Sequence, residues 1–169
     1  MILNIFNFAA NKYQDMIQRI QTLYLLVAAL LVAALFFVPF AELMVRDGNL
    51  YQFDIFGIFQ EGDNGGTSLI NTWPVTVLVC LSVIMLILTI LMYKNRPRQV
   101  TFSYSTIGLI LSFQGLINFY AWSGNNILGE TYSLRIYAGL PLVAVIFVFL
   151  AIRGIKKDEN LVKSIDRIR

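Results

Sequence analysis

The sequence predicts an all-α integral membrane protein, a four-helix bundle whose helices cross the bilayer. Two observations predict this fold class: four long apolar runs, and Lys and Arg residues that gather between particular runs. The chain of 169 residues is 57% hydrophobic and only 14% charged, whereas about a quarter of the residues in a soluble domain are charged. The spans are expected at about residues 23–40, 73–92, 101–122 and 136–152.

The second run, residues 73–92, is the clearest span. It contains no charged side chain and is followed at once by Lys94, Arg96 and Arg98. A helix rises about 1.5 Å per residue, so a run of this length matches the roughly 30 Å hydrocarbon core of a bilayer. The short link after it, which contains Pro97, predicts that the second and third spans form an antiparallel helical hairpin.

The first run, residues 23–40, follows Lys12 and Arg19, an arrangement that a cleaved signal peptide also has. Its long apolar core and Pro39 near its end favour an uncleaved span instead. The apolar residues 1–10 are too short to cross a bilayer. We expect residues 1–15 to be an interfacial or disordered extension, and residues 16–169 to form a single membrane domain.

The long loop of residues 41–72 carries a turn signal, Asp47-Gly48-Asn49, between two apolar stretches. Such a signal predicts a small β-hairpin in the first outer loop, with arms at about residues 43–45 and 50–59. Two interpretations of the second arm stand: it packs on the membrane surface or the helix ends, or it docks another protein. The aromatic residues of this arm are Tyr51, Phe53, Phe56 and Phe59.

The third run is the most polar of the four, and it carries a candidate polar helix face. Gln114 and Asn118 are four residues apart, which places them on one side of a helix, and Ser112 completes the candidate face. An amide that faces lipid is unfavourable, so we expect this face to look inward. It serves either as a polar contact between helices or as the lining of a small cavity or a lipid headgroup site.

Residues 153–169 predict an amphipathic cytoplasmic helix at the C-terminus. Leu161, Ile165 and Ile168 recur at helical spacing and form an apolar stripe. We expect the stripe to lie on the membrane or to pack against Ile17 and Ile20. A candidate surface for a partner or for anionic lipid headgroups is formed by the cations of this tail, Arg153, Lys156, Lys157, Lys163, Arg167 and Arg169.

The positive charges set the expected orientation. With both termini inside, eleven of the 13 Lys and Arg residues lie on the inner side, and only Arg46 and Arg135 lie in the outer loops. Positive residues gather on the cytoplasmic side of short loops. Both termini are therefore predicted to be cytoplasmic, with the lipid bilayer as the main surrounding of the chain.

Composition also bears on the classes of function. The sequence has no His, a single Cys (Cys80) and no charged residue inside any of the four runs. Catalysis needs nucleophiles, acids, bases or metal ligands, so we expect neither an enzyme nor a cofactor or metal site. The loop carboxylates Glu42, Asp54 and Glu130 have no spacing that demands a shared site, and basic residues sorted by side of the membrane do not predict nucleic-acid binding.

Three stretches carry a resemblance to a known family: MIQRIQTLYL from Met16, YKNR from Tyr93 and AIRGIKKDENLVKSIDRIR from Ala151. Together they resemble an uncharacterised family of small four-span membrane proteins from Bacteroidetes, catalogued as a domain of unknown function (number 4293). The resemblance implies the inner membrane of a Gram-negative bacterium. It implies no activity and no functional residue, but its charged motifs imply a shared constraint at the cytoplasmic surface.

The function hypothesis follows from a chemically inert membrane core and two informative surfaces. We expect a non-catalytic inner-membrane subunit, assembly factor or scaffold that binds a protein partner or forms a homo-oligomer. The alternative is a small transporter or lipid-handling protein that uses the polar face of the third span, Ser112, Gln114 and Asn118.

Overall fold

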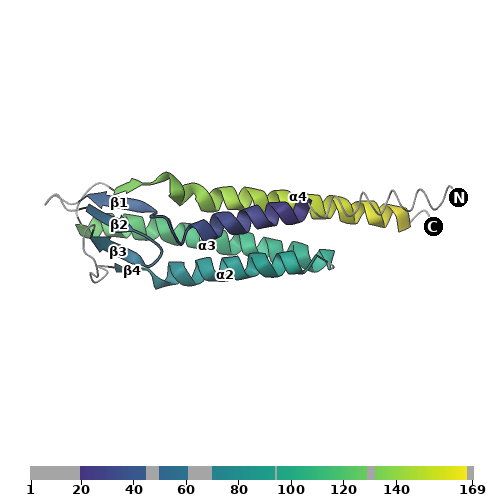
Figure 1. Cartoon of the computed structure of the whole chain (residues 1–169), viewed down its shortest axis with the longest axis horizontal. Coiled ribbons are helices and arrows are strands. Elements are labelled where there is room, and N and C mark those ends of the chain that lie inside the picture. Colours follow the sequence, from purple (N-terminus) through teal and green to yellow (C-terminus); the bar gives the residue numbers. More distant parts are fainter. Residues whose placement is uncertain (1–19, 45–49, 61–69, 94, 129–131, 167–169) are drawn as a thin grey trace.

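The structure is a computed structural model that describes residues 20–44, 50–60, 70–93, 95–128 and 132–166. Within these residues, four α-helices run side by side along the long axis, and a sheet lies at one end of them (Figure 1). The first helix is Ile20–Ala34. The helices that follow in the chain are α2 (Trp73–Leu91), α3 (Arg96–Leu128) and α4 (Leu140–Asp166), with a short 3-10 helix, η1 (Ile136–Gly139), leading into α4.

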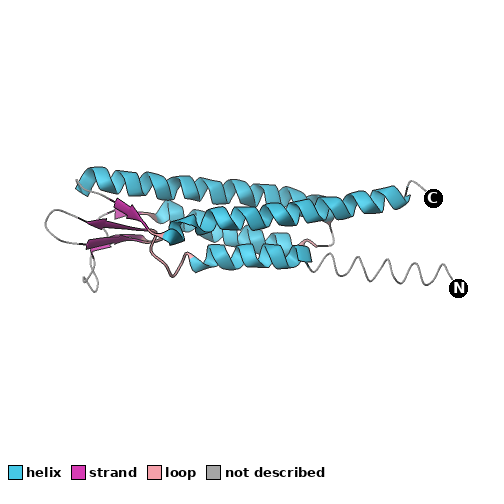
Figure 2. Ribbon diagram, turned by 90° about the horizontal axis from the view of Figure 1, so that it is seen from above, coloured by secondary structure: helices cyan, strands magenta, loops and turns pink. Residues whose placement is uncertain are grey.

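The expectation of an all-α fold is wrong, because a five-stranded sheet is attached to the helices (Figure 2). Each strand is antiparallel to its neighbours. The spatial order is β4-β3-β2-β1-β5. The strands are β1 (Ala41–Met44), β2 (Leu50–Phe53), β3 (Gly57–Gln60), β4 (Ile70–Asn71) and β5 (Tyr132–Leu134).

The predicted hairpin is confirmed for its first two strands, since β1 and β2 pair with Met44 opposite Leu50. The second arm is two strands rather than one, and Asp54 is the reason. Its Oδ1 accepts hydrogen bonds from the backbone N–H groups of Phe56 (2.8 Å) and Gly57 (3.1 Å), which is how an Asp side chain stabilises a turn. The chain therefore folds back after β2, and β3 pairs with β2.

The fifth strand comes from the loop between α3 and α4, far along the chain from the other four. In the pairing of β1 with β5, Ala41 lies opposite Leu134. The next residue, Arg135, donates its backbone N–H to the Phe40 carbonyl at 2.9 Å, and its guanidinium forms an ion pair with Glu42. These contacts join the two loops into one sheet.

The sheet rests on α3, the longest helix, which has 33 residues and so spans about 50 Å at 1.5 Å per residue. Near its C-terminal end, Gly124 lies directly beneath the strands. A Cβ at this position would stand 3.1 Å from Cδ1 of Ile58 and 3.4 Å from Cδ2 of Leu43. The missing side chain lets the helix approach the sheet closely.

The first helix ends at Ala34, earlier than the predicted span that runs to residue 40. The N–H groups of Leu35, Phe36 and Phe37 bond to carbonyls three residues back rather than four. Pro39, which has no N–H, then prevents further helix, and the chain enters β1. The end of the apolar run is therefore not helical, and its side chains differ in burial: Phe40 is fully buried, whereas Phe37 is 87% exposed.

The predicted helical tail is part of α4 and not a separate helix. α4 runs unbroken from Leu140 to Asp166, and its C-terminal part continues in line beyond the ends of the other helices (Figure 1). The tail therefore leaves the bundle along the helix axis. The side chains of the predicted apolar stripe, Leu161, Ile165 and Ile168, lie outside the described residues.

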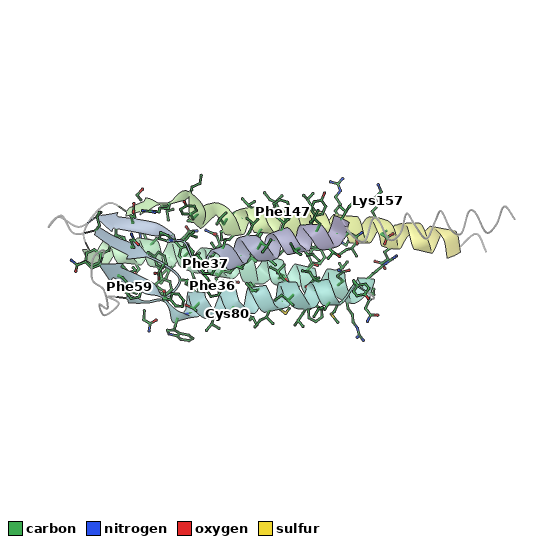
Figure 3. The ribbon with its side chains drawn as sticks, in the orientation of Figure 1. Phe36, Phe37, Phe59, Cys80, Phe147 and Lys157 are labelled. Atoms are coloured by element: carbon green, nitrogen blue, oxygen red, sulfur yellow. The ribbon has the colours of Figure 1, made fainter. Side chains whose placement is uncertain are left out.

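Three helices are long and apolar enough to cross a membrane, over Trp73–Leu91, Arg96–Gly124 and Ile136–Asn160. Only 28%, 33% and 39% of their apolar windows are buried inside the chain, and the remaining side chains project from the bundle (Figure 3). Soluble monomers rarely expose apolar surface on this scale. The described part of the first helix is apolar but shorter.

Two aromatic residues of the sheet provide a test of this packing. Phe53 is fully buried beside Phe40, at 5.3 Å between ring centroids, whereas Phe56, three residues on, is 55% exposed. We expect Phe53→Ala to destabilise the protein by about 3–5 kcal/mol through the cavity it leaves, and Phe56→Ala to change stability by less than about 0.5 kcal/mol. Thermal unfolding of the detergent-solubilised variants measures both, and equal shifts would contradict the described core.

Candidate functional site at the charged end of the helices

Charged side chains of the described residues lie only at the two ends of the helices. At the sheet end, Glu42 pairs with Arg135, and Asp54 accepts backbone hydrogen bonds. We call the opposite end the charged end, where Lys157 lies on α4 (Figure 3). The charged end carries Arg96, Arg98, Arg153, Lys156, Lys157, Asp158 and Glu159.

An ion pair between α3 and α4 is the central contact of the charged end. Nη2 of Arg96, the first residue of α3, lies 2.9 Å from Oδ2 of Asp158 on α4. The two side chains are 20% and 3% exposed. The carboxylate also lies close to the N-terminus of α3, where a helix favours negative charge. The pair fixes the start of α3 against α4.

This ion pair is not an aligned hydrogen bond. Within the described residues, Oδ2 of Asp158 has no hydrogen-bond partner despite its 2.9 Å separation from Arg96, so the guanidinium N–H groups do not point at the oxygen. The contact is therefore mainly a charge interaction in a site that excludes water, and removal of one partner leaves the other charge uncompensated.

A close approach between the first helix and α4 lies one turn away from Asp158. Gln21 is 6% exposed and packs over Gly154, where a Cβ would stand 3.1 Å from Cγ of Gln21. Glycine lets helix backbones approach in this way. Nε2 of Gln21 has no hydrogen-bond partner among the described residues.

The three stretches that carry the family resemblance meet at this place. Gln21 belongs to the first stretch, Arg96 to the second, and Gly154 and Asp158 to the third. Sequence reasoning did not single out these four residues. The signal present in the sequence is an acid, Asp158, directly after two cations, Lys156 and Lys157. In the structure Asp158 is buried, whereas both lysines are exposed.

At the exposed surface of the charged end, Lys156 of α4 contacts Tyr104 of α3. Nζ of Lys156 donates a hydrogen bond to the Tyr104 hydroxyl at 2.9 Å and lies 5.1 Å from the centre of its ring. Lys156, Lys157 and Arg153 are all exposed, as is Arg98 on α3. The charged end thus holds a buried acid inside and exposed cations outside.

The structure places the predicted tail residues unevenly. Arg153, Lys156 and Lys157 lie together on the exposed surface of α4. The side chains of Lys163, Arg167 and Arg169 lie outside the described residues.

The aromatic arm does not form a single exposed patch. Phe53 is fully buried, while Tyr51 and Phe59 are partly buried, and Phe56 alone of the four is exposed. Alternation along a strand explains part of this, because successive side chains point to opposite faces of the sheet. The part of the arm that remains available for docking is the turn at Phe56.

The candidate polar face of the third span is divided. Gln114 is 9% exposed, and its Oε1 has no hydrogen-bond partner among the described residues. Ser112 and Asn118 are exposed, so the expected inward orientation does not hold for them. At about 100° per residue, Gln114 lies at the edge of the buried side of α3, and Asn118 lies beyond that edge.

Ser112 has a local partner for its hydroxyl, which donates to the carbonyl of Gly108 at 2.8 Å. Gln114, Ser112 and Asn118 therefore do not converge on one path within a single chain. Among the described residues, no three His, Cys, Asp or Glu side chains are grouped so that they could hold a metal ion.

The ion pair of the charged end can be tested against a neighbouring arginine. We expect Arg96→Gln to lower the free energy of unfolding by about 2 kcal/mol, because it leaves Asp158 buried without a counter-charge while the partial exposure of Arg96 screens the pair. Arg98→Gln removes the same charge from an exposed position and should change it by less than about 0.5 kcal/mol.

Thermal unfolding in one detergent measures this difference. Asp158→Asn added to Arg96→Gln should cost less than the two single changes together, since the partners are coupled. Strictly additive effects would show that the two side chains do not interact.

Comparison with known proteins covers almost the whole chain. A search of curated proteins finds no match. The family described as Domain of unknown function (DUF4293) matches residues 17–168, a range that includes every helix, strand and ion pair of the described residues. The chain belongs to the DUF4293 family.

Proposed function

We propose that this chain is a multi-pass inner-membrane protein with four spans and cytoplasmic termini, and that it acts as a non-catalytic subunit, assembly factor or scaffold. The observation that carries the membrane part is the distribution of exposed apolar side chains. They cover the outward sides of α2, α3 and α4, while the described charged side chains are confined to the helix ends. A bilayer satisfies such a surface, because its hydrocarbon core lies between two polar boundaries.

The boundaries of the apolar surface support the same arrangement. Trp73 and Trp122, near the sheet end, are 63% and 57% exposed, while Tyr93 and Tyr104, near the charged end, are 49% and 46% exposed. Exposed Trp and Tyr residues gather at membrane–water interfaces. A membrane-spanning bundle is expected to carry such Trp and Tyr residues near both ends of its helices, as this chain does.

The sign of the charges supports the orientation. Among the described residues the charged end holds five Lys or Arg residues, Arg96, Arg98, Arg153, Lys156 and Lys157, and the sheet end holds Arg135 alone. Arg135 is neutralised by Glu42. The charged end is therefore the cytoplasmic one under the positive-inside rule, and the sheet lies on the opposite side.

The first helix completes the bundle in this proposal. It packs along the others through Leu25, Ala28 and Val32, all of them fully buried.

The contacts and the projecting segments at the two ends of the helices support the scaffold role. The carboxylates described at the sheet end are engaged by Arg135 and by backbone N–H groups, and the buried acid of the charged end faces Arg96. These contacts hold rigid surfaces in place on either side of the membrane. Phe56 projects from the sheet, and the tail of α4 projects from the charged end (Figure 1).

Purification of the native chain in nanodiscs, followed by mass spectrometry, tests the role. We expect a protein partner at fixed stoichiometry. Phe56→Asp or truncation after Asn160 should remove it, and both changes leave the buried contacts of Phe53, Arg96 and Asp158 in place. The matched control is Gln60→Ala, an exposed position on the same sheet. A lone protein, or a partner that is retained in both variants, would contradict this proposal.

A further inference from the structure

One exposed cation at the charged end, Lys156, is positioned by contacts with Tyr104. The ammonium of Lys156 is fixed by the Tyr104 hydroxyl at 2.9 Å and by the ring face at 5.1 Å. Both contacts leave ammonium protons for a further acceptor, since an ammonium has three donors. A cation that is already positioned loses less entropy when it binds an anion.

A second cation lies on the same side of α4. Arg153 precedes Lys156 by three residues, which places the two on neighbouring turns of one face. Arg153 is exposed, and Asp158, the buried acid of the same helix, is paired with Arg96. Lys156 and Arg153 therefore present positive charge at the exposed surface of α4.

Apolar surface continues from these cations toward the sheet. Phe149 and Ile146, one and two turns from Arg153 on α4, are 54% and 59% exposed. A molecule with an anionic head and a long apolar tail matches this order of charged and apolar surface.

We propose that Lys156, Arg153 and Tyr104 form a binding site for the phosphate of an anionic phospholipid, with one acyl chain lying along Phe149 and Ile146. The site rests on the proposed function, in which the charged end meets the inner leaflet. A phospholipid, and not free phosphate, is the expected ligand because the apolar surface begins directly beside the cations.

Native mass spectrometry of the full chain in a non-ionic detergent tests the site, with phosphatidylglycerol and phosphatidylcholine of identical acyl chains as probes. The wild-type protein should retain phosphatidylglycerol in preference to phosphatidylcholine. Lys156→Gln and Arg153→Gln should each weaken phosphatidylglycerol binding about five-fold, the effect of one cation near a headgroup, and the double variant should lose the preference.

Arg98→Gln is the matched control. Arg98 lies at the same end and is exposed, but it is about a third of a turn around α3 from Tyr104 at 100° per residue. We expect this variant to bind phosphatidylglycerol like the wild type. Tyr104→Phe should weaken binding less than Lys156→Gln, because the ring remains beside the ammonium when the hydroxyl is removed.

Three results would overturn the proposal. These are equal retention of the two lipids by the wild type, an equal loss in Arg98→Gln and Lys156→Gln, and displacement of the lipid by millimolar inorganic phosphate. Because the measurement is made in detergent, it does not depend on the orientation in the membrane. Failure of the lipid site and failure of the proposed topology are therefore distinguishable.

Discussion

A helix in hydrocarbon has to satisfy its polar groups within the protein, because no water is present to bond them. The hydroxyl groups of the long helices meet this constraint locally. Ser82, Thr89, Ser103 and Thr106 each donate to a backbone carbonyl four residues earlier, at 2.7–2.8 Å. The polar residues of the apolar segments therefore add little polarity to the helix surfaces. Gln114, with an unpaired Oε1, and Asn118, whose side chain is exposed, are exceptions.

The same constraint explains why the sheet and the charged side chains lie at the ends of the helices. Outside the apolar zone, backbone groups can be joined in a sheet, and two separate loops use this possibility through β1 and β5. At the opposite end, Asp158 is buried only where Arg96 provides the counter-charge. In the proposed topology, the exposed cations around that pair face the polar boundary of the bilayer, where the proposed lipid site lies.

The apolar runs and the positive charges were sufficient to predict the helices α2, α3 and α4, because length and charge patterning are local properties of the sequence. The first hairpin was also predictable, since Asp47-Gly48-Asn49 is a turn signal. β5 was not, because its pairing with β1 depends on how α3 and α4 bring the second loop beside the first. The division of the arm into β2 and β3 depends on the bonds of a single side chain, that of Asp54.

The contacts of the charged end could not be predicted from local sequence either. Each of Gln21, Arg96 and Asp158 is visible as a polar residue next to an apolar run, but their contacts require the helices to be placed side by side. The separation of Gln114 from Asn118 has a related cause. Spacing shows that two residues are neighbours on a helix, but the packing of α3 against α2 and α4 decides where the buried side ends.

The central claim is that the sheet and the charged end lie on opposite sides of a membrane, with the charged end in the cytoplasm. Single cysteines in a Cys80→Ser background test it most directly, at the exposed positions Gln60, Ser133, Asn95 and Asn160. With an impermeant maleimide on intact spheroplasts, Gln60→Cys and Ser133→Cys should react, and Asn95→Cys and Asn160→Cys should react only after permeabilisation. Reaction of all four before permeabilisation, or the reverse pattern, would contradict the account.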